Sequence, residues 1–194
     1  MKKIAVFVSG GGTNCEQIIR HFAESSLARV VLVLSSSKTA YALERARHLG
    51  VPTTTLTKKQ FEDPAVVLDL MKIYEVDFIV LTGFLWVIPD WLVEAFDHRM
   101  VNLHPALLPK FGGIGMYGRH VHEAVKAAGE TVTGMTVHYV SNVVDGGEAI
   151  AQFFVPVRPE DTPETIAAKE HELEMRYFPG VIEGLLKDFS QPGL

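Results

Sequence analysis

Short apolar runs alternate with helical patterns along the first hundred residues of the chain. The strand-like runs are rich in Val, Ile and Leu and cover residues 3–8, 29–36, 51–57, 76–84 and 100–104. Between them, apolar residues recur at helical spacing over residues 14–25, 40–50, 64–75 and 89–99. Parallel strands buried on both faces give such continuous apolar runs, and helices usually connect them. The pattern therefore predicts an α/β fold with a doubly wound, mostly parallel, Rossmann-like sheet.

The pattern changes after Pro109. A helix is predicted next, followed by two strands joined by a turn and then by one long helix; these elements cover residues 120–130, 131–141, 148–157 and 162–186, with the turn at 142–147. Two strands joined by so short a turn pair antiparallel. We therefore expect them to extend one edge of the sheet as an antiparallel addition.

Composition and charge narrow the class of protein. A chain of 194 residues with 47% hydrophobic content can bury one sizeable core, which predicts a single domain over 1–188 and a C-terminal tail over 189–194. The net charge is −5 and no basic block occurs, so nucleic acid is not an expected partner. The single cysteine suits a reducing compartment. The first apolar run is too short for a signal peptide, and none reaches the roughly 20 residues of a membrane span. We expect a soluble, cytoplasmic protein without a membrane partner.

Ligands of open α/β sheets bind outside the carboxyl ends of the strands. Three segments fall at such ends, namely "SGGGTN" at 9–14, "TGFLW" at 82–86 and "NLHP" at 102–105. A fourth candidate, "DGG" at 145–147, lies in the turn between the last two predicted strands. We therefore look for the chemistry of the protein in these four segments.

The glycine-rich segment has two interpretations. Consecutive glycines let backbone N–H groups approach an anion closely, and the helix that follows adds the positive end of its dipole. The segment is not a dinucleotide fingerprint, because Cys15 stands where the third glycine would be, and it lacks the Lys-Ser/Thr pair of a Walker A loop. It is either a site for the terminal phosphate of a small substrate or a tight turn before a capped helix. Thr13 and Asn14 would supply side-chain donors or the cap.

Asn102 and His104 lie two residues apart at the end of a buried strand and therefore share one face. An amide can donate to a developing oxyanion, and an imidazole can donate or move a proton. The pair lacks a carboxylate to set the tautomer and charge of the histidine, and Asp145 is the expected supplier. The trio indicates direct group transfer or hydrolysis without a covalent intermediate on the enzyme. The alternative is a purely structural role at the strand end.

The cysteine and the other histidines give weaker signals. Cys15 falls in the first turn of a predicted helix, where the dipole can lower a thiol pKa, but a lone cysteine is more often a packing residue. His120 and His122 diverge on a helix and cannot share an ion, and no HExxH motif or cysteine cluster occurs, so no metal is expected. His138 alternates with Thr136 and Val140 on a predicted strand, which favours a satisfied core histidine. Three more histidines are expected on helices and in contact with solvent: His21, His48 and His98.

Six stretches, in order, resemble the phosphoribosylglycinamide formyltransferase family of folate-dependent enzymes. They are "VFVSGGGTNCEQII", "ERARHLGVP", "LTGFLWVIP", "VNLHPALLPKFGG", "TGMTVHYV" and "VDGGEAIAQ". The resemblance spans about residues 3–186 and implies the formyltransferase fold. Its most specific part is the N-x-H-P-x-L-L-P stretch with D-G-G some forty residues later, which a wider formyl-transfer superfamily shares. Many members carry an arginine after "GF", where this chain has Trp86.

The resemblance also implies roles for individual residues. The catalytic trio would be Asn102, His104 and Asp145. The phosphate and ribonucleotide would be bound by Gly11, Gly12, Thr13, Asn14 and Glu174. The folate pocket would be walled by Leu85, Trp86, Val87, Ile88, Val143 and Val144, together with Asn102 and Asp145.

The implied reaction is direct transfer of the formyl group of 10-formyltetrahydrofolate to the amine of glycinamide ribonucleotide, the third step of de novo purine biosynthesis. It passes through a tetrahedral intermediate, with Asp145 raising the pKa of His104 above its ordinary value so that the imidazole stays cationic. The expected partners are these small molecules, and a homodimer is left open. Three alternatives remain: a formyltetrahydrofolate hydrolase, another formyltransferase of the superfamily, and a non-catalytic nucleotide-binding module.

Overall fold

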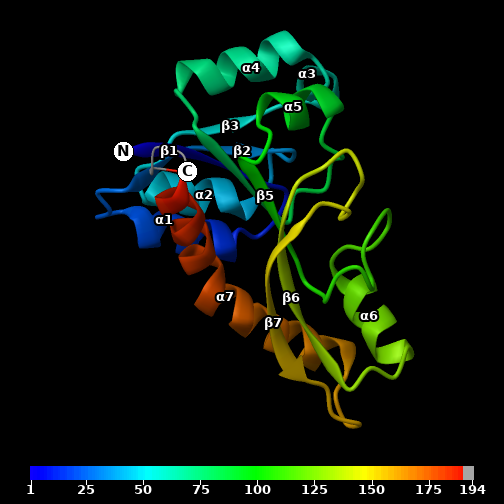
Figure 1. Ribbon diagram of the computed structural model, residues 1–194. Helices are drawn as coiled ribbons and strands as arrows, with labels where there is room; N and C mark the ends of the chain where they lie inside the picture. The colour runs from blue at the N-terminus through cyan, green and yellow to red at the C-terminus, as the bar shows by residue number, and fades with distance from the viewer. Residues whose placement is uncertain (190–194) are drawn as a thin grey trace.

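The computed structural model describes residues 1–189, so most of the predicted tail at 189–194 lies outside the described residues. Its centre is a seven-stranded sheet with the strand order β3-β2-β1-β4-β5-β6-β7 (Figure 1). The strands are β1 (Lys2–Val8), β2 (Ala28–Ser35), β3 (Thr53–Thr55), β4 (Phe78–Thr82), β5 (Met100–His104), β6 (Val132–Tyr139) and β7 (Ala149–Pro156). The first five are parallel, whereas β6 runs antiparallel to β5 and β7 antiparallel to β6. The predicted fold class, including the antiparallel edge extension, is confirmed.

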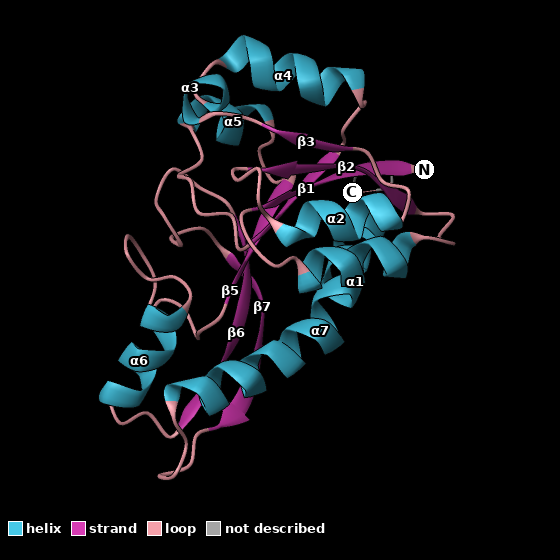
Figure 2. Ribbon diagram, turned by 180° about the vertical axis from the view of Figure 1, so that it is seen from behind, coloured by secondary structure: helices cyan, strands magenta, loops and turns pink. Residues whose placement is uncertain are grey.

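Helices cover both faces of the parallel strands (Figure 2). They are α1 (Thr13–Phe22), α2 (Tyr41–His48), α3 (Lys58–Phe61), α4 (Pro64–Ile73), α5 (Asp90–Ala95), α6 (Arg119–Ala127) and α7 (Pro163–Asp188). Helices α1, α2 and α7 pack on one face, and α3, α4 and α5 on the other. Along β1, Val6 faces the first group and Phe7 the second, and both are fully buried. Because both faces are covered, the strands read as unbroken apolar runs.

Several elements differ from the sequence-based prediction; for example, β3 is limited to Thr53–Thr55 where 51–57 was expected, and α6 ends at Ala127 rather than at residue 130. Helix α3 was not predicted, because its four residues are too few to show a helical period. Helices α1 and α5 end three or four residues earlier than expected, at Phe22 and Ala95. His98 consequently lies in the turn before β5 with a φ of 52° rather than on a helix. These turns lead directly into the next strand, which the hydrophobic period does not reveal.

Helix α7 is the longest of the described helices and lies behind β6 and β7 in the view of Figure 1. It begins at a capping box formed by Thr162 and Thr165. Its inner face includes Glu170, which is fully buried, accepts a hydrogen bond from the Thr133 hydroxyl at 2.5 Å and lies 2.6 Å from His122 Nδ1. Burial raises the pKa of this carboxyl. Through Glu170, α7 is tied to β6 and to α6. Among the described residues, no helix is long and apolar enough to cross a membrane.

The pairing of β6 with β7 depends on Gly134, because a Cβ there would lie 1.8 Å from the carbonyl oxygen of Phe153. We expect Gly134→Ala to lower the free energy of unfolding by about 2–4 kcal/mol, as overpacking against rigid backbone does. Gly184→Ala on α7 is the matched control, because a Cβ there meets no atom within 4 Å. It should stabilise the helix by about 0.5–1 kcal/mol. Urea unfolding of both variants checks this; a Gly134→Ala protein as stable as the wild type would contradict it.

Candidate active site

A cavity of about 620 Å³ opens at the carboxyl ends of β1, β4 and β5. Its walls come from residues 9–14, 82–87, 102–105 and 113–118, with Val144, Asp145, His171 and Glu174 completing the lining. The volume suits a small-molecule ligand. The four segments singled out in the sequence therefore meet at one cavity, as expected for an open α/β sheet.

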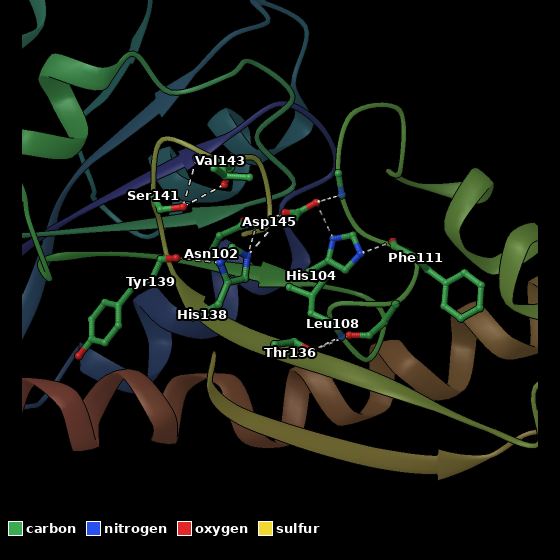
Figure 3. Close-up of polar contacts among 12 residues, drawn as sticks. Asn102, His104, Leu108, Phe111, Thr136, His138, Tyr139, Ser141, Val143 and Asp145 are labelled. Carbon is green, nitrogen blue, oxygen red and sulfur yellow. Dashed lines mark hydrogen bonds and ion pairs between the residues drawn. The ribbon is translucent and has the colours of Figure 1, made fainter. Parts of the chain in front are cut away.

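Asp145 lies at the centre of the polar groups in this cavity (Figure 3). Its Oδ1 is 3.4 Å from Asn102 Nδ2 and 3.6 Å from His138 Nε2. Its Oδ2 accepts the backbone N–H of Gly113 at 2.9 Å and lies 3.5 Å from His104 Nδ1. Burial raises the pKa of Asp145, but the protonated forms of His138 and His104 and the hydrogen bond from the backbone N–H of Gly113 together lower it by more. The pKa of Asp145 is therefore lower than its ordinary value, and the group is a carboxylate at neutral pH.

His104 is 3% exposed, and both of its ring nitrogens face oxygen acceptors. Nε2 lies 2.8 Å from the carbonyl of Phe111, and Nδ1 faces Asp145. A neutral imidazole that donates from Nε2 to Phe111 leaves the Nδ1 lone pair directed at the carboxylate. Burial lowers the pKa of His104 by more than Asp145 raises it, so the net pKa is below the ordinary value. The expectation that Asp145 keeps this histidine cationic was wrong, because it left out the cost of burying the imidazolium.

His138 also belongs to this cluster, although the sequence suggested only a core histidine. Its Nδ1 lies 2.9 Å from the Tyr139 carbonyl, which requires a proton on Nδ1. Nε2 of the neutral ring is then an acceptor and takes a hydrogen from Asn102 Nδ2 at 3.1 Å. The contact orients the Asn102 amide. The signal missing from the sequence was the register of β5 with β6, which places Asn102 opposite His138.

The segment after β5 is fixed by two polar side chains of the antiparallel strands. Thr136 Oγ1 donates to the carbonyl of Ala106 at 2.7 Å and accepts the N–H of Leu108 at 3.0 Å. The Gln152 amide donates to the Leu108 carbonyl at 2.9 Å. The Leu108–Pro109 peptide bond is cis. These contacts direct the chain back toward the cavity, where the Phe111 carbonyl meets His104.

The glycine loop follows β1 and leads into α1. Gly12 has a φ of +75°, and a Cβ on it would lie 2.3 Å from the Cβ of Ala42, so only glycine fits between the loop and α2. Two backbone carbonyls of the loop accept hydrogen bonds from α2: the Ala42 N–H donates to the Gly10 carbonyl, and Arg45 Nε donates to the Gly11 carbonyl. The N–H groups of the first turn of α1, at Thr13 and Asn14, have no intrahelical partner. The loop is therefore held in place by α2, and the N–H groups at the start of α1 are available to a ligand.

Asn14, His171 and Glu174 connect the glycine loop with α7. Asn14 Nδ2 donates to Glu174 Oε2 at 2.7 Å, and His171 Nδ1 lies 3.1 Å from the same oxygen. The hydrogen bond to Glu174 raises the pKa of His171, which lines the cavity and was not singled out in the sequence. Asn14 Oδ1 is buried and has no hydrogen-bond partner among the described residues. This end of the cavity thus offers a histidine whose raised pKa favours its protonated form, two acceptors and backbone donors.

Only some of the residues expected to line a folate pocket lie at the cavity. Leu85, Trp86, Val87 and Val144 line the cavity, and Trp86 packs against Phe84 and Phe61. Ile88 instead lies in the core between the sheet and α3–α5. Val143 lines a different depression, together with Val93, Glu94, Asp97 and His98. The loop at 113–118 is longer than in many members of the family and had no role predicted from the sequence; it lines the cavity and presents the exposed side chains of Ile114 and Tyr117.

Two other kinds of chemistry were considered from the sequence. Cys15 is fully buried, and burial raises the pKa of its thiol to about 12, which leaves it a packing residue. Among the described residues, no group of three or more His, Cys, Asp or Glu side chains is placed to hold a metal ion. His120 and His122 point apart: His120 is exposed, whereas His122 turns inward to Glu170.

Comparison with known proteins places this geometry in a family. Residues 2–182 match the family model described as formyl transferase. A chloroplastic phosphoribosylglycinamide formyltransferase of Arabidopsis thaliana is 40% identical over 96% of this chain and 67% of its own length. The phosphoribosylglycinamide formyltransferase of Bacillus subtilis is 36% identical over 96% of this chain and 95% of its own. The crystal structure of the Anaplasma phagocytophilum enzyme superposes with a TM-score of 0.88 at 30% identity, covering 96% of this chain and 88% of the other.

The buried thiol gives a direct check of the site. We expect the folded protein to resist a thiol reagent such as Ellman's reagent at pH 8, because a fully buried thiol with a pKa of about 12 is neither accessible nor ionised. The same protein unfolded in guanidinium should react fully with one equivalent, since the chain has one cysteine. Cys15→Ala should retain most of the enzymatic activity. Rapid labelling of the folded protein with loss of activity would restore the cysteine as a candidate nucleophile.

Proposed function

The chain belongs to the formyl transferase family, and we propose that it transfers the formyl group of 10-formyltetrahydrofolate to the amine of glycinamide ribonucleotide. This is the phosphoribosylglycinamide formyltransferase reaction of purine biosynthesis. It is a reaction between two small molecules and fits the cytoplasm, the compartment expected from the composition. One observation carries the proposal most directly: Asn102, His104 and Asp145 meet in a cavity that also contains the glycine loop.

The chemistry begins with attack of the neutral glycinamide amine on the formyl carbon. A carbon–nitrogen bond forms, and the formyl oxygen becomes an oxyanion. Asn102 Nδ2 has two hydrogens, one given to His138 at 3.1 Å and the other directed at Asp145 over a long 3.4 Å contact. The second hydrogen is the one available to the oxyanion. One such preorganised donor is typically worth about 3–4 kcal/mol of transition-state stabilisation.

The proton of the attacking amine must reach N10 of the folate before the carbon–nitrogen bond to the folate breaks. N10 is an anilinic nitrogen and leaves poorly unless it is protonated. The lowered pKa of His104 leaves its Nδ1 free to accept the amine proton, and the Asp145 carboxylate at 3.5 Å stabilises the imidazolium that results. His104 then gives the proton to N10. The histidine acts as a relay that begins and ends the cycle neutral.

The end of the cavity at α1 suits the ribonucleotide. The free N–H groups of Thr13 and Asn14, and the close approach that Gly11 and Gly12 allow, fit a phosphate. His171 can add a positive charge, because its hydrogen bond to Glu174 raises its pKa and so favours the protonated ring. Glu174 and the unpartnered Asn14 Oδ1 are acceptors, which suit the hydroxyl groups of a ribose. This arrangement of donors and acceptors matches a phosphate followed by a sugar.

The opposite end of the cavity suits the folate. The exposed side chains of Leu85 and Val87 and the indole of Trp86 give an apolar rim for an aromatic ring system. Trp86 is held by Phe61 and Phe84, with centroid distances of 5.3 and 5.8 Å. Val144 and Asp145 complete this wall. The polar trio lies between the two ends, where the formyl group and the amine would meet.

A single assay tests the proposal. The purified protein is mixed with 10-formyltetrahydrofolate, with and without glycinamide ribonucleotide, and the deformylated folate, the formylated nucleotide and free formate are measured. We expect deformylated folate and formylated nucleotide in equal amounts, only when both substrates are present. Formate release without the nucleotide would identify a hydrolase instead, and ligand binding without turnover would identify a non-catalytic binding module.

Two substitutions should separate the two ends of the cavity. Glu174→Gln keeps the shape of the side chain but weakens hydrogen bonding to a sugar hydroxyl, so KM for the nucleotide should rise about tenfold, the scale of one charged hydrogen bond. Trp86→Ala should raise KM for the folate by a similar factor, through loss of apolar contact. Each variant is the other's control and should leave the second KM within about twofold. Equal effects on both substrates in either variant would contradict this division of the cavity.

The relay predicts that His104 and Asp145 act as one unit. Asp145→Asn keeps the approximate shape but removes the charge that stabilises the protonated histidine, and we expect kcat to fall about 10²–10⁴-fold. His104→Ala should lose a similar factor, and the double variant little more than either. The Kd of each substrate should change little. Steady-state kinetics of the four proteins measure this; losses that multiply in the double variant would show that the two side chains act independently.

A further inference from the structure

Phe111 has an unusual backbone conformation next to the polar groups of the cavity. Its φ is +57°, in the left-handed region that a bulky side chain rarely adopts. Such a conformation is costly and persists only where the surrounding structure imposes it. The carbonyl of this residue lies 2.8 Å from His104 Nε2, and two residues later the N–H of Gly113 donates to Asp145 at 2.9 Å. The strained position therefore belongs to a segment that contacts both His104 and Asp145.

The side chain of Phe111 is anchored away from the cavity. Figure 3 shows its ring pointing away from the imidazole of His104. The ring packs against a small apolar cluster, separate from the two cores that flank the sheet, which consists of Val125 on α6, Val157 after β7 and Ile166 on α7. All three are buried. Apolar burial of the ring offsets the cost of the backbone conformation.

Helix α6, which carries part of this cluster, is itself held by a buried carboxyl group. His122 Nδ1 on α6 lies 2.6 Å from Glu170 on α7, and the same carboxyl accepts a hydrogen bond from the Thr133 hydroxyl on β6. Val125 follows His122 by about one turn of the helix. Polar contacts as well as apolar packing therefore fix the cluster that receives the Phe111 ring.

The two acceptors on either side of His104 favour opposite tautomers of its neutral ring. A proton on Nε2 suits the Phe111 carbonyl at 2.8 Å, whereas a proton on Nδ1 suits the Asp145 carboxylate at 3.5 Å. The contact with the carbonyl has the length of a good hydrogen bond, and the contact with the carboxylate is longer than one. The position of the Phe111 carbonyl therefore decides which nitrogen carries the proton.

We propose that Phe111 is a positioning residue for the transfer reaction: its anchored side chain holds its carbonyl against His104 and so fixes the tautomer whose lone pair is on Nδ1. The effect on catalysis rests on the proposed function, in which Nδ1 accepts the proton of the attacking amine. Without the anchor, the carbonyl moves away and the proton shifts to Nδ1, where Asp145 accepts the hydrogen bond. Nδ1 then has no lone pair for the amine proton, and the relay cannot begin.

NMR of the free protein, labelled with ¹⁵N at histidine, tests the proposal without any substrate. At a pH where the ring is neutral, the ¹⁵N chemical shifts show which nitrogen carries the proton, and His104→Ala identifies the signals of His104 by their absence. We expect the proton on Nε2 in the wild type. Phe111→Gly removes the anchor but readily adopts a positive φ, and it should shift the tautomer ratio about tenfold toward Nδ1, the scale of one hydrogen bond. Phe111→Leu keeps an apolar anchor and should keep the wild-type tautomer.

Val125→Ala tests the anchor without changing the segment itself. Val67→Ala is its matched control, because Val67 is also a buried valine on a helix but belongs to the core on the other face of the sheet. Both deletions should lower the stability by a similar amount. We expect Val125→Ala to shift the tautomer ratio in the same direction as Phe111→Gly, and Val67→Ala to leave it unchanged. Equal ratios in the two valine variants would contradict the role of the anchor.

Steady-state kinetics provide the second readout. In Phe111→Gly, kcat should fall about tenfold, in proportion to the lost tautomer, while KM for each substrate changes by less than about twofold. Phe111→Leu should recover kcat to within about twofold of the wild type. Two results would overturn the proposal: a wild-type His104 with its proton on Nδ1, or a Phe111→Gly protein with the wild-type tautomer ratio. Because the tautomer is measured without substrate, a protein that transfers no formyl group would refute the proposed function and leave this result to be judged separately.

Discussion

The site depends on a buried carboxylate that must be surrounded by donors. Removing Asp145 from water is costly unless hydrogen bonds and opposite charges compensate. Asn102 Nδ2 and the backbone N–H of Gly113 face the carboxylate as donors, and the rings of His104 and His138 lie 3.5 and 3.6 Å from it and stabilise it when protonated. These groups come from three segments of the chain: β5, β6 and the loop after Phe111. Each of these groups is in turn fixed by its contact with the carboxylate. The geometry of the site is therefore a consequence of satisfying one charge.

The sheet brings these groups together at the point where it changes from parallel to antiparallel. Strand β5 pairs in parallel with β4 and antiparallel with β6, so its end faces both the cavity and the added hairpin. The register places Asn102 opposite His138 and His104 opposite Thr136. His138 orients the Asn102 amide, and Thr136 holds the loop that returns to His104. The antiparallel addition thus supports the site as well as extending the sheet.

Much of this arrangement could be predicted from the sequence, for physical reasons. The continuous apolar runs reflect strands buried on both faces, and the glycine loop and "NLHP" segment stand at strand ends because of the topology. The contact of His138 with Asn102 could not be predicted, since the sequence of either strand alone does not determine the register in which the two antiparallel strands pair. The lowering of the His104 pKa could not be predicted, because the burial that causes it depends on the whole fold. The burial of Ile88 could not be predicted for the same reason, because only the packing of α3–α5 shows that it turns into the core.

The central claim is that burial keeps His104 neutral in the free protein while Asp145 stabilises the proton it receives. NMR titration of the His104 imidazole in the wild type and in Asp145→Asn tests it most directly. The account predicts a wild-type pKa below the ordinary value of 6.5, and a still lower pKa in Asp145→Asn, because the group that raises it has lost its charge. A wild-type pKa above 6.5, or one that the substitution leaves unchanged, would contradict the account.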